Sequence, residues 1–155
     1  MSDADGDKNY KLIATNRKAY HDYSIEETLE AGLVLTGTEI KSIRLGRVSL
    51  REAYARVEKG EAWLINAHIA LYPSGNRYNH EPTRARKILL HRKQLAWLTG
   101  KVREKGYTMV PLRLYIKRGF AKIELALGRG KRAYDKREAI AQRDAQREME
   151  RAVKV

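Results

Sequence analysis

Apolar and polar residues alternate along several short segments of the chain, and this period of two is typical of β-strands. It predicts strands within 10–34, 54–57, 62–69, 87–90, 107–116 and 120–127. The second and third segments form the clearest predicted hairpin, and Lys117-Arg118-Gly119 joins the last two segments into another. In the third segment one face is predicted to carry Trp63, Ile65, Ala67 and Ile69. Gly32 interrupts the first segment, which indicates a bulge or a sharp bend there.

Two helices are predicted between these strands. Leu95, Leu98 and Val102 are spaced i, i+3 and i+7, which predicts a helix over 91–104. A shorter helix is predicted within 37–46, where Thr38 is the expected N-cap and Gly46 the expected end. Its inward-facing residues are expected to be Ile40, Ile43 and Leu45.

This order of elements predicts an α+β fold, mainly β, with an antiparallel sheet. Closing the strands into a small barrel removes exposed edges, and an oligonucleotide-binding-type barrel is the expected form. We expect a disordered leader over 1–8, a barrel domain over 9–127, and a basic, helix-prone C-terminal tail over 128–155. Residues 73–84 are predicted to form a long polar loop.

The charge of the chain narrows its possible partners. Its 155 residues contain 32 Lys and Arg against 19 Asp and Glu, a formal net charge of +13. Residues 8–127 hold 23 of the basic and 11 of the acidic residues, a net charge of +12, and all of these residues except Lys8 lie in the predicted barrel. A surplus of this size favours a polyanionic partner, and RNA, DNA and an anionic membrane all fit it.

Several functional classes become less probable on composition and motifs. The chain has no cysteine, which excludes disulfides and thiolate chemistry. Its polar start and the absence of a long apolar run predict a cytoplasmic protein without a membrane span. The four histidines lack metal-ligand spacing, and no known catalytic motif occurs. We therefore expect a binding protein without catalytic residues, metal or cofactor.

Basic residues with interspersed tyrosines form two candidate binding clusters. They are Arg84, Arg86, Lys87, Arg92 and Lys93, then Arg113, Lys117, Arg118 and Lys122, with Tyr72, Tyr78, Tyr107 and Tyr115 among them. Such rings can stack on bases, although a solvated basic face with tyrosines at the core rim explains the pattern equally well. Strand alternation adds that Leu89 points outward if Ile88 and Leu90 are buried. It also places Lys122 outward if the core set is Ile123, Leu125 and Leu127.

The tail has a different pattern from the barrel domain. Residues 136–151 are good helix formers, and Arg143, Arg147 and Arg151 recur at i, i+4 and i+8. Apolar residues are too sparse there to form a docking face, so we expect a tail that is disordered when free and helical against phosphates.

Six sequence landmarks, in order, resemble the small protein B family, the bacterial SsrA-binding proteins. They are Asn16–Tyr23, Glu30-Ala31-Gly32, Gly37–Arg44, Asn79–His91, Gly106-Tyr107-Thr108, and Gly128–Arg132 followed by Tyr134–Arg137. The resemblance runs from about residue 10 to residue 137. It implies a barrel that binds the tRNA-like domain of transfer-messenger RNA and brings it to stalled ribosomes for trans-translation. It further implies a tail that enters the empty small-subunit decoding site and messenger channel.

The resemblance also assigns individual residues. Glu30, Leu89 and Lys122 match positions that contact the RNA, and for the last two this agrees with the strand alternation. Arg84, Arg86 and Lys87 are added as RNA-binding candidates from the basic cluster. The tail candidates for contact with the ribosome that the resemblance gives are Gly130, Lys131, Arg132, Tyr134, Asp135, Lys136 and Arg137. Arg143, Arg147 and Arg151 are added from the basic stripe of the predicted tail helix.

Two other functions remain open at this point. One is a generic ribosomal or translation-factor RNA-binding barrel, and the other is an RNA-processing enzyme. A monomer is expected. Trp97 lies one step off the apolar stripe of its helix, so it either covers the barrel or is exposed.

Overall fold

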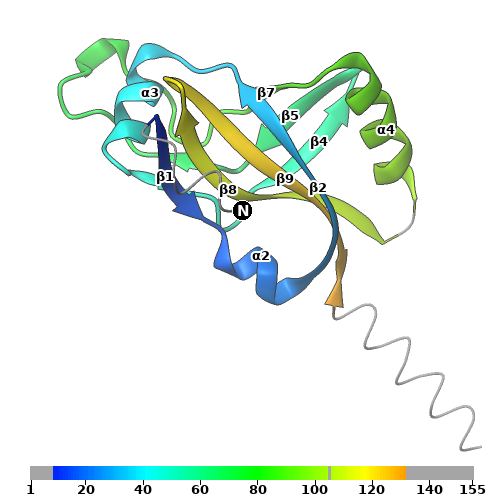
Figure 1. Ribbon diagram of the computed structural model, residues 1–155. Helices are drawn as coiled ribbons and strands as arrows, with labels where there is room; N and C mark the ends of the chain where they lie inside the picture. Colours follow the sequence, from blue (N-terminus) through cyan, green and yellow to red (C-terminus); the bar gives the residue numbers. More distant parts are fainter. Residues whose placement is uncertain (1–8, 105, 132–155) are drawn as a thin grey trace, which may run out of the picture.

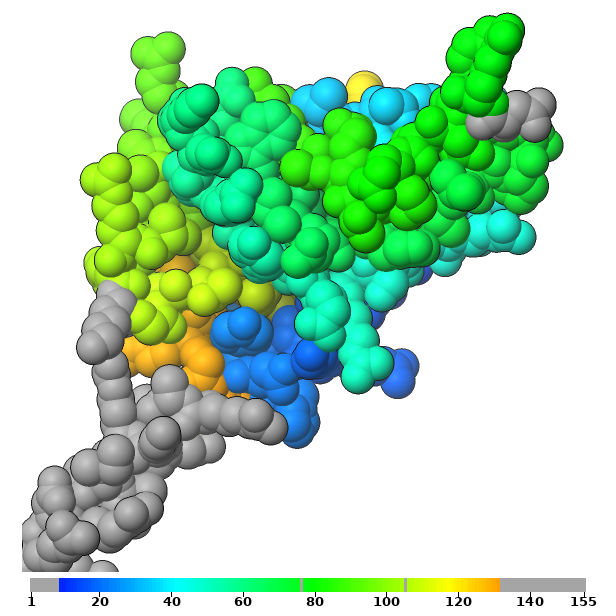
Figure 2. Space-filling view, turned by 180° about the vertical axis from the view of Figure 1, so that it is seen from behind, coloured from blue at the N-terminus to red at the C-terminus, as the bar shows by residue number. Residues whose placement is uncertain are grey.

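A computed structural model describes residues 9–104 and 106–131, and these form a mainly β, α+β fold (Figure 1). The strands are β1 (Tyr10–Thr15), β2 (Tyr23–Leu33), β3 (Val48–Ser49), β4 (Tyr54–Glu58), β5 (Glu61–Ile65), β6 (His68–Ile69), β7 (Arg86–Leu89), β8 (Tyr107–Lys117) and β9 (Phe120–Gly130). The helices are α2 (Arg17–Asp22), α3 (Gly37–Arg44) and α4 (Arg92–Arg103), with a 3₁₀ turn, η1 (Asn76–Tyr78). The chain around η1 projects from one corner of the molecule, at the upper right of Figure 2. Helices α3 and α4 lie at opposite ends of the strands in Figure 1.

Seven strands form one antiparallel sheet in the order β1-β8-β4-β5-β7-β2-β9, and β8 also pairs with β9. One edge of β8 is divided between two partners, β1 at Arg113–Lys117 and β4 at Met109. Its other edge pairs with β9 along most of its length. The pairing therefore returns from β9 to β8, and the short strands β3 and β6 form a separate pair.

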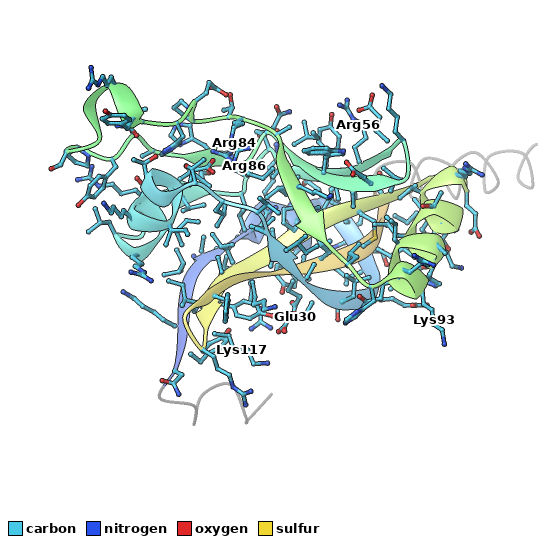
Figure 3. The ribbon with its side chains drawn as sticks, turned by 90° about the horizontal axis from the view of Figure 1, so that it is seen from above. Glu30, Arg56, Arg84, Arg86, Lys93 and Lys117 are labelled. Atoms are coloured by element: carbon cyan, nitrogen blue, oxygen red, sulfur yellow. The ribbon has the colours of Figure 1, made fainter. Side chains whose placement is uncertain are left out.

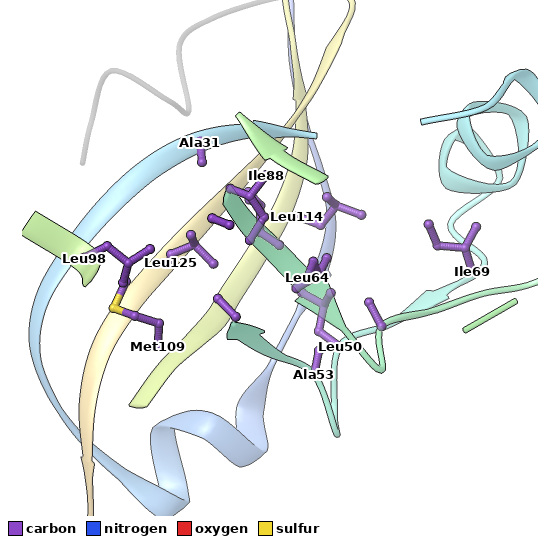
Figure 4. Close-up of a cluster of buried hydrophobic side chains, with 14 of the residues drawn as sticks. Ala31, Leu50, Ala53, Leu64, Ile69, Ile88, Leu98, Met109, Leu114 and Leu125 are labelled. Atoms are coloured by element: carbon purple, nitrogen blue, oxygen red, sulfur yellow. The ribbon is translucent and has the colours of Figure 1, made fainter. Parts of the chain in front are cut away.

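The main core lies between these strands, as the close-up in Figure 4 shows. Ile123, Leu125 and Leu127 are all buried, which confirms the core set predicted for this strand. Leu98 is also fully buried, and the other two stripe residues of α4 pack against the core. Trp97 is partly buried against the same cluster, so it covers the core. A smaller cluster under α2 contains Ala19, Val110, Leu112 and Ala126.

The first helix, α2, was not predicted, because it has no apolar stripe: only Ala19 is buried. Its formation follows from Asn16, whose side chain accepts from the Ala19 N–H at 3.2 Å. The same buried side chain donates to the carbonyls of Leu50 (3.0 Å) and Pro111 (2.9 Å). Asn16 therefore caps the helix and joins three parts of the fold.

Helix α3 begins two residues earlier than its predicted cap implies. Thr36, and not Thr38, is the N-cap, and it forms a capping box with Glu39. Ile43 is fully buried as expected, whereas Leu45 is 56% exposed and its predicted inward orientation is wrong. Leu45 is already the C-cap of the helix, so the helical spacing no longer applies to it.

The face predicted for 62–69 changes within the segment. Ala62 and Leu64 are buried in β5, and Ala67 and Ile69 are buried after it. Between them Asn66 has a φ of +63°, a left-handed conformation that breaks the alternation. The prediction that Trp63 and Ile65 share a face with the later residues is therefore wrong.

Two further sequence expectations need correction. Strand β9 continues to Gly130, which pairs with Tyr23, so the folded part extends past the predicted boundary at residue 127. The pairing irregularity in β2 falls between Ile25 and Glu27, and Gly32, where a bulge or bend was predicted, is regularly paired on both sides.

The predicted leader and most of the predicted tail lie outside the described residues. In the described part of the chain, no helix is long and apolar enough to span a membrane.

A buried ion pair joins α3 to β7. Glu39 and Arg86 are both completely buried, and the Arg86 Nε donates to the Glu39 carboxylate at 2.5 Å. Arg84 donates to the same carboxylate at 2.5 Å and the Thr36 N–H does so at 2.8 Å. The Arg86 guanidinium also donates to the carbonyls of Ala67 (2.7 Å) and Glu81 (3.3 Å). Its prediction as an RNA contact is therefore wrong, because a side chain with no exposed surface cannot reach a phosphate.

Burial alone would raise the pKa of Glu39, but the hydrogen bonds from Arg84, Thr36 and Arg86 outweigh it and lower the pKa to about 2. A depressed carboxyl pKa stabilises the fold at every pH above the ordinary value of 4.5. That contribution is lost as the pH falls from 4.5 through about 2.

We expect Glu39→Gln to lower the free energy of unfolding at pH 7 by about 3–5 kcal/mol, because it leaves the buried Arg86 without its counter-charge. Denaturant unfolding measures this loss. The difference from the wild-type protein should shrink between pH 4.5 and pH 2, since only wild-type Glu39 titrates there. Glu26→Gln, at an exposed carboxylate of β2, is the control and should change little. A difference that stays constant with pH would contradict the assignment.

Candidate nucleic-acid interface

Leu89 and Lys122 lie on either side of Gly32, on three adjacent strands. Gly32 of β2 pairs with Leu89 of β7 and with Lys122 of β9. A Cβ atom at Gly32 would lie 3.4 Å from the Leu89 Cβ and 3.8 Å from the Lys122 Nζ. The missing side chain thus leaves both neighbours accessible above the middle strand. Leu89 is 50% exposed while Ile88 is buried, so the predicted outward orientation of Leu89 is confirmed.

Glu30 lies two residues before Gly32 on the same face of β2. The buried Tyr115 of β8 donates its hydroxyl to the Glu30 carboxylate, and the Lys117 Nζ is 3.7 Å from it. Figure 3 shows Glu30 and Lys117 on the same side of the sheet. The outer face of β2, β7 and β9 therefore brings together Glu30, Leu89 and Lys122, the three residues singled out in the sequence; this set is called the outer-face triad below.

Two aromatic side chains lie beneath Glu30, the partly buried Tyr10 and the buried Tyr115. The Tyr10 ring packs on Tyr115 with 5.1 Å between centroids. Burial raises the pKa of the Tyr115 phenol, and the hydrogen bond to Glu30 raises it further, so this hydroxyl stays a proton donor at neutral pH. Beside it, Arg113 donates to Glu124 at 2.8 Å, which leaves that carboxylate neutralised.

Leu89 and Lys122 also separate two hollows in this face. One has a volume of about 330 Å³ and is lined by Glu30 together with His91 and Gln94, where α4 begins. The other lies toward the β8–β9 turn and α3. The face is thus neither flat nor uniformly charged. The Glu30 carboxylate lines one of the two hollows, and the Leu89 side chain and the Lys122 ammonium group line both.

The predicted basic cluster at β7 does not join this face. Lys87 forms an ion pair with Glu61 at 3.2 Å. Arg84 is partly exposed, but its guanidinium is held by Glu39. Figure 3 places Arg84 and Arg86 apart from Glu30. The charges of Arg84, Arg86 and Lys87 are largely compensated within the fold, whereas Arg92 and Lys93 are exposed at the start of α4.

Of the tail candidates, only Gly130 and Lys131 are described. Gly130 is the last residue of β9, and the exposed Lys131 donates its Nζ to the Tyr20 carbonyl at 3.2 Å. The remaining candidates lie outside the described residues: Arg132, Tyr134, Asp135, Lys136, Arg137, Arg143, Arg147 and Arg151.

Sequence reasoning gave Gly32 no function in this site, and it listed Tyr115 only as a ring for base stacking, whereas Tyr115 is buried. The position of Tyr115 beside Lys122 could have been predicted, because the two residues lie opposite each other across the predicted β8–β9 hairpin. No sequence signal linked Tyr115 to Glu30, since the contact spans 85 residues. Among the described residues, no group of three or more His, Asp or Glu side chains is placed to hold a metal ion.

These features define a class: a small, basic, mainly antiparallel β-protein whose outer sheet face carries side chains suited to contacting a nucleic acid. A family model described as "SmpB protein" matches residues 13–155. The SsrA-binding protein of Halalkalibacterium halodurans is 61% identical over 149 residues, covering 96% of this chain and 97% of its own length. That of Geobacillus kaustophilus is 63% identical over 142 residues, covering 92% of each chain.

A solved structure described as "tmRNA-SmpB: a journey to the center of the bacterial ribosome" contains a chain that is 50% identical to this one. The two superpose with a TM-score of 0.66, over 77% of this chain and 84% of the other. The chain belongs to the SmpB protein family, and the resemblance found in the sequence is confirmed.

We expect Glu30→Gln to lower the pKa of Tyr115, because it removes the carboxylate charge that disfavours the phenolate. Burial, the larger cause, should still keep that pKa above the ordinary 10.0. An NMR pH titration of ring-labelled tyrosine measures it. Glu27→Gln, an exposed carboxylate on the same strand, is the control. An unchanged Tyr115 titration in Glu30→Gln would show that the two side chains do not interact in solution.

Proposed function

We propose that this protein binds the tRNA-like domain of transfer-messenger RNA and brings it to stalled ribosomes for trans-translation. The observation that carries the proposal is the SmpB family match over residues 13–155. Relatives named SsrA-binding protein, and the ribosome-associated tmRNA-SmpB structure, support the two partners. A match of this extent favours the specific adaptor over a generic ribosomal barrel.

The outer-face triad is the proposed RNA contact. The Glu30 carboxylate can accept from base amino groups, the exposed Leu89 can pack beneath a base, and Lys122 can approach a phosphate. Each role needs an outward side chain, and Glu30 and Leu89 are both exposed. Arg84 and Lys87 could add charge only by leaving Glu39 and Glu61, so their contribution should be smaller.

The sheet is proposed to be a closed oligonucleotide-binding-type barrel. Pairing runs from β8 through β4, β5, β7, β2 and β9 and returns to β8, which supports closure. The barrel would act as a rigid support for the RNA face. The protein is proposed to work in the cytoplasm as a monomer, with no catalytic step and no cofactor.

The tail over 128–155 is proposed to enter the empty decoding site and messenger channel of the small subunit. Its support is the sequence, where the basic positions of the tail fit contacts with ribosomal phosphates. Because β9 continues to Gly130, the segment available for this role begins after the strand.

We expect Glu30→Ala, Leu89→Ala and Lys122→Ala each to weaken binding of the tRNA-like RNA by about 1–3 kcal/mol, roughly five- to hundredfold in Kd. Fluorescence anisotropy with labelled RNA measures this. The melting temperature should remain near that of the wild type, because these side chains are not part of the core.

Leu71→Ala is the matched control for Leu89→Ala, because Leu71 is 52% exposed and lies in the loop before η1. It should leave the RNA affinity unchanged. Equal affinity in the Leu71→Ala and Leu89→Ala variants would contradict the proposed contact.

Deleting residues 134–155 should separate RNA binding from ribosome rescue. Affinity for the isolated tRNA-like RNA should be nearly unchanged, because the outer-face triad and most of the positive charge remain. Tagging of nascent peptides on stalled ribosomes should be lost. Both assays are to be run on the same truncated protein. Full tagging activity would refute the role of the tail, and loss of RNA binding would show that the tail is part of the RNA contact.

A further inference from the structure

A notch opens in the outer face where β2 and β9 separate. Their pairing ends at Gly32 and Lys122, after which β2 continues toward α3 and β9 turns back into β8. The resulting cavity has a volume of about 190 Å³. On one side it shares Leu89 and Lys122 with the hollow that contains Glu30. It is therefore continuous with the outer-face triad.

The floor of this notch is apolar, and its deepest residue is fully buried. The floor is formed by Leu33, Leu35, Ile40, Ile43, Ile116 and Ala121, of which Ile43 is completely buried. Phe120 lies at the rim and is 69% exposed. An apolar floor beneath an exposed aromatic ring is suited to a flat, weakly polar ligand.

The hairpin turn holds Phe120 in a defined position. Arg118 and Gly119 have φ angles of +53° and +82°, which is the backbone of a tight two-residue turn. Phe120 pairs with Lys117 across this turn. The Arg118 N–H also donates to the Asn9 carbonyl at 2.9 Å, which ties the turn to the start of β1. The ring is therefore presented by a short, hydrogen-bonded turn.

The charges around the notch all have the same sign. Arg44 and Lys122 line it, and neither has an ion-pair partner among the described residues. The described residues that line it include no carboxylate. A cavity of about 150 Å³ suffices for benzene, so 190 Å³ accepts one aromatic ring. An aromatic ring with an attached phosphate is the chemistry that satisfies the apolar floor, the Phe120 ring and the two cations together.

We propose that this notch receives one unstacked nucleobase, which stacks on Phe120 while Arg44 and Lys122 contact the adjoining phosphates. The proposal rests on the proposed function and adds to it a second base position beside the outer-face triad. Phe120 and Arg44 become nucleic-acid contacts that the sequence did not indicate. Stacking of this kind is tolerant of sequence, so the notch adds affinity more than base selectivity.

The test uses the fact that Phe120 is the single phenylalanine of the chain. Full-length protein labelled with 4-fluorophenylalanine gives one ¹⁹F signal, which should shift when the tRNA-like RNA is added. Phe120→Ala should weaken affinity roughly five- to hundredfold, and Phe120→Trp should retain it. Arg44→Ala should weaken affinity and reduce its dependence on salt.

Leu71→Ala is again the control, because Leu71 is 52% exposed and lies in the loop before η1. If Glu30→Ala weakens binding but Phe120→Ala behaves like Leu71→Ala, the notch is not a base site while the proposed function stands. An unshifted ¹⁹F signal in a saturated complex has the same meaning. If the wild-type protein does not bind this RNA at all, both the function and the notch proposal fail.

Discussion

The ion pair between Glu39 and Arg86 is the interaction on which the position of the outer face depends. Arg86 begins β7, and its guanidinium is held by Glu39 of α3 and by two carbonyls from the segments before β7. Two buried charges that are paired and hydrogen-bonded have few alternative arrangements, since a displacement leaves a charge unpaired. The start of β7 is therefore fixed, and Leu89, three residues on, is placed opposite Gly32.

A fixed β7 matters because the outer face is assembled from three strands that are distant in sequence. A register slip of one residue would turn Leu89 inward and Ile88 outward. Glu30 has its own constraint, because Tyr115 holds its carboxylate from beneath and Lys117 approaches it from the side. A face that is already ordered loses less conformational entropy when a ligand binds. The buried polar contacts thus order the proposed RNA-binding face from beneath, although they are not part of it.

Alternation predicted the orientation of Leu89 and the core set of β9 from sequence, because both lie in regular strands with clear apolar neighbours. The same alternation indicated that Arg86 points inward, because residues 86, 88 and 90 lie on the same face of the strand. Arg86 was instead counted as an exposed charge of the basic cluster, so its inward position was overlooked. The other wrong or absent predictions depend on information that hydrophobic periodicity does not contain. The left-handed Asn66 reverses the faces of its segment, and α2 depends on a cap with partners 34 and 95 residues away.

Net charge alone therefore does not locate a binding surface in this protein. At β7, the carboxylates of Glu39 and Glu61 compensate cations that look available in the sequence. Around the β8–β9 turn the balance differs, because Arg44 and Lys122 lie beside apolar side chains and form no ion pair among the described residues. An uncompensated cation attracts a phosphate more strongly than a paired one, since no internal contact must first be broken. The surface where charge is left over and apolar groups remain exposed is consequently the one best suited to contact RNA.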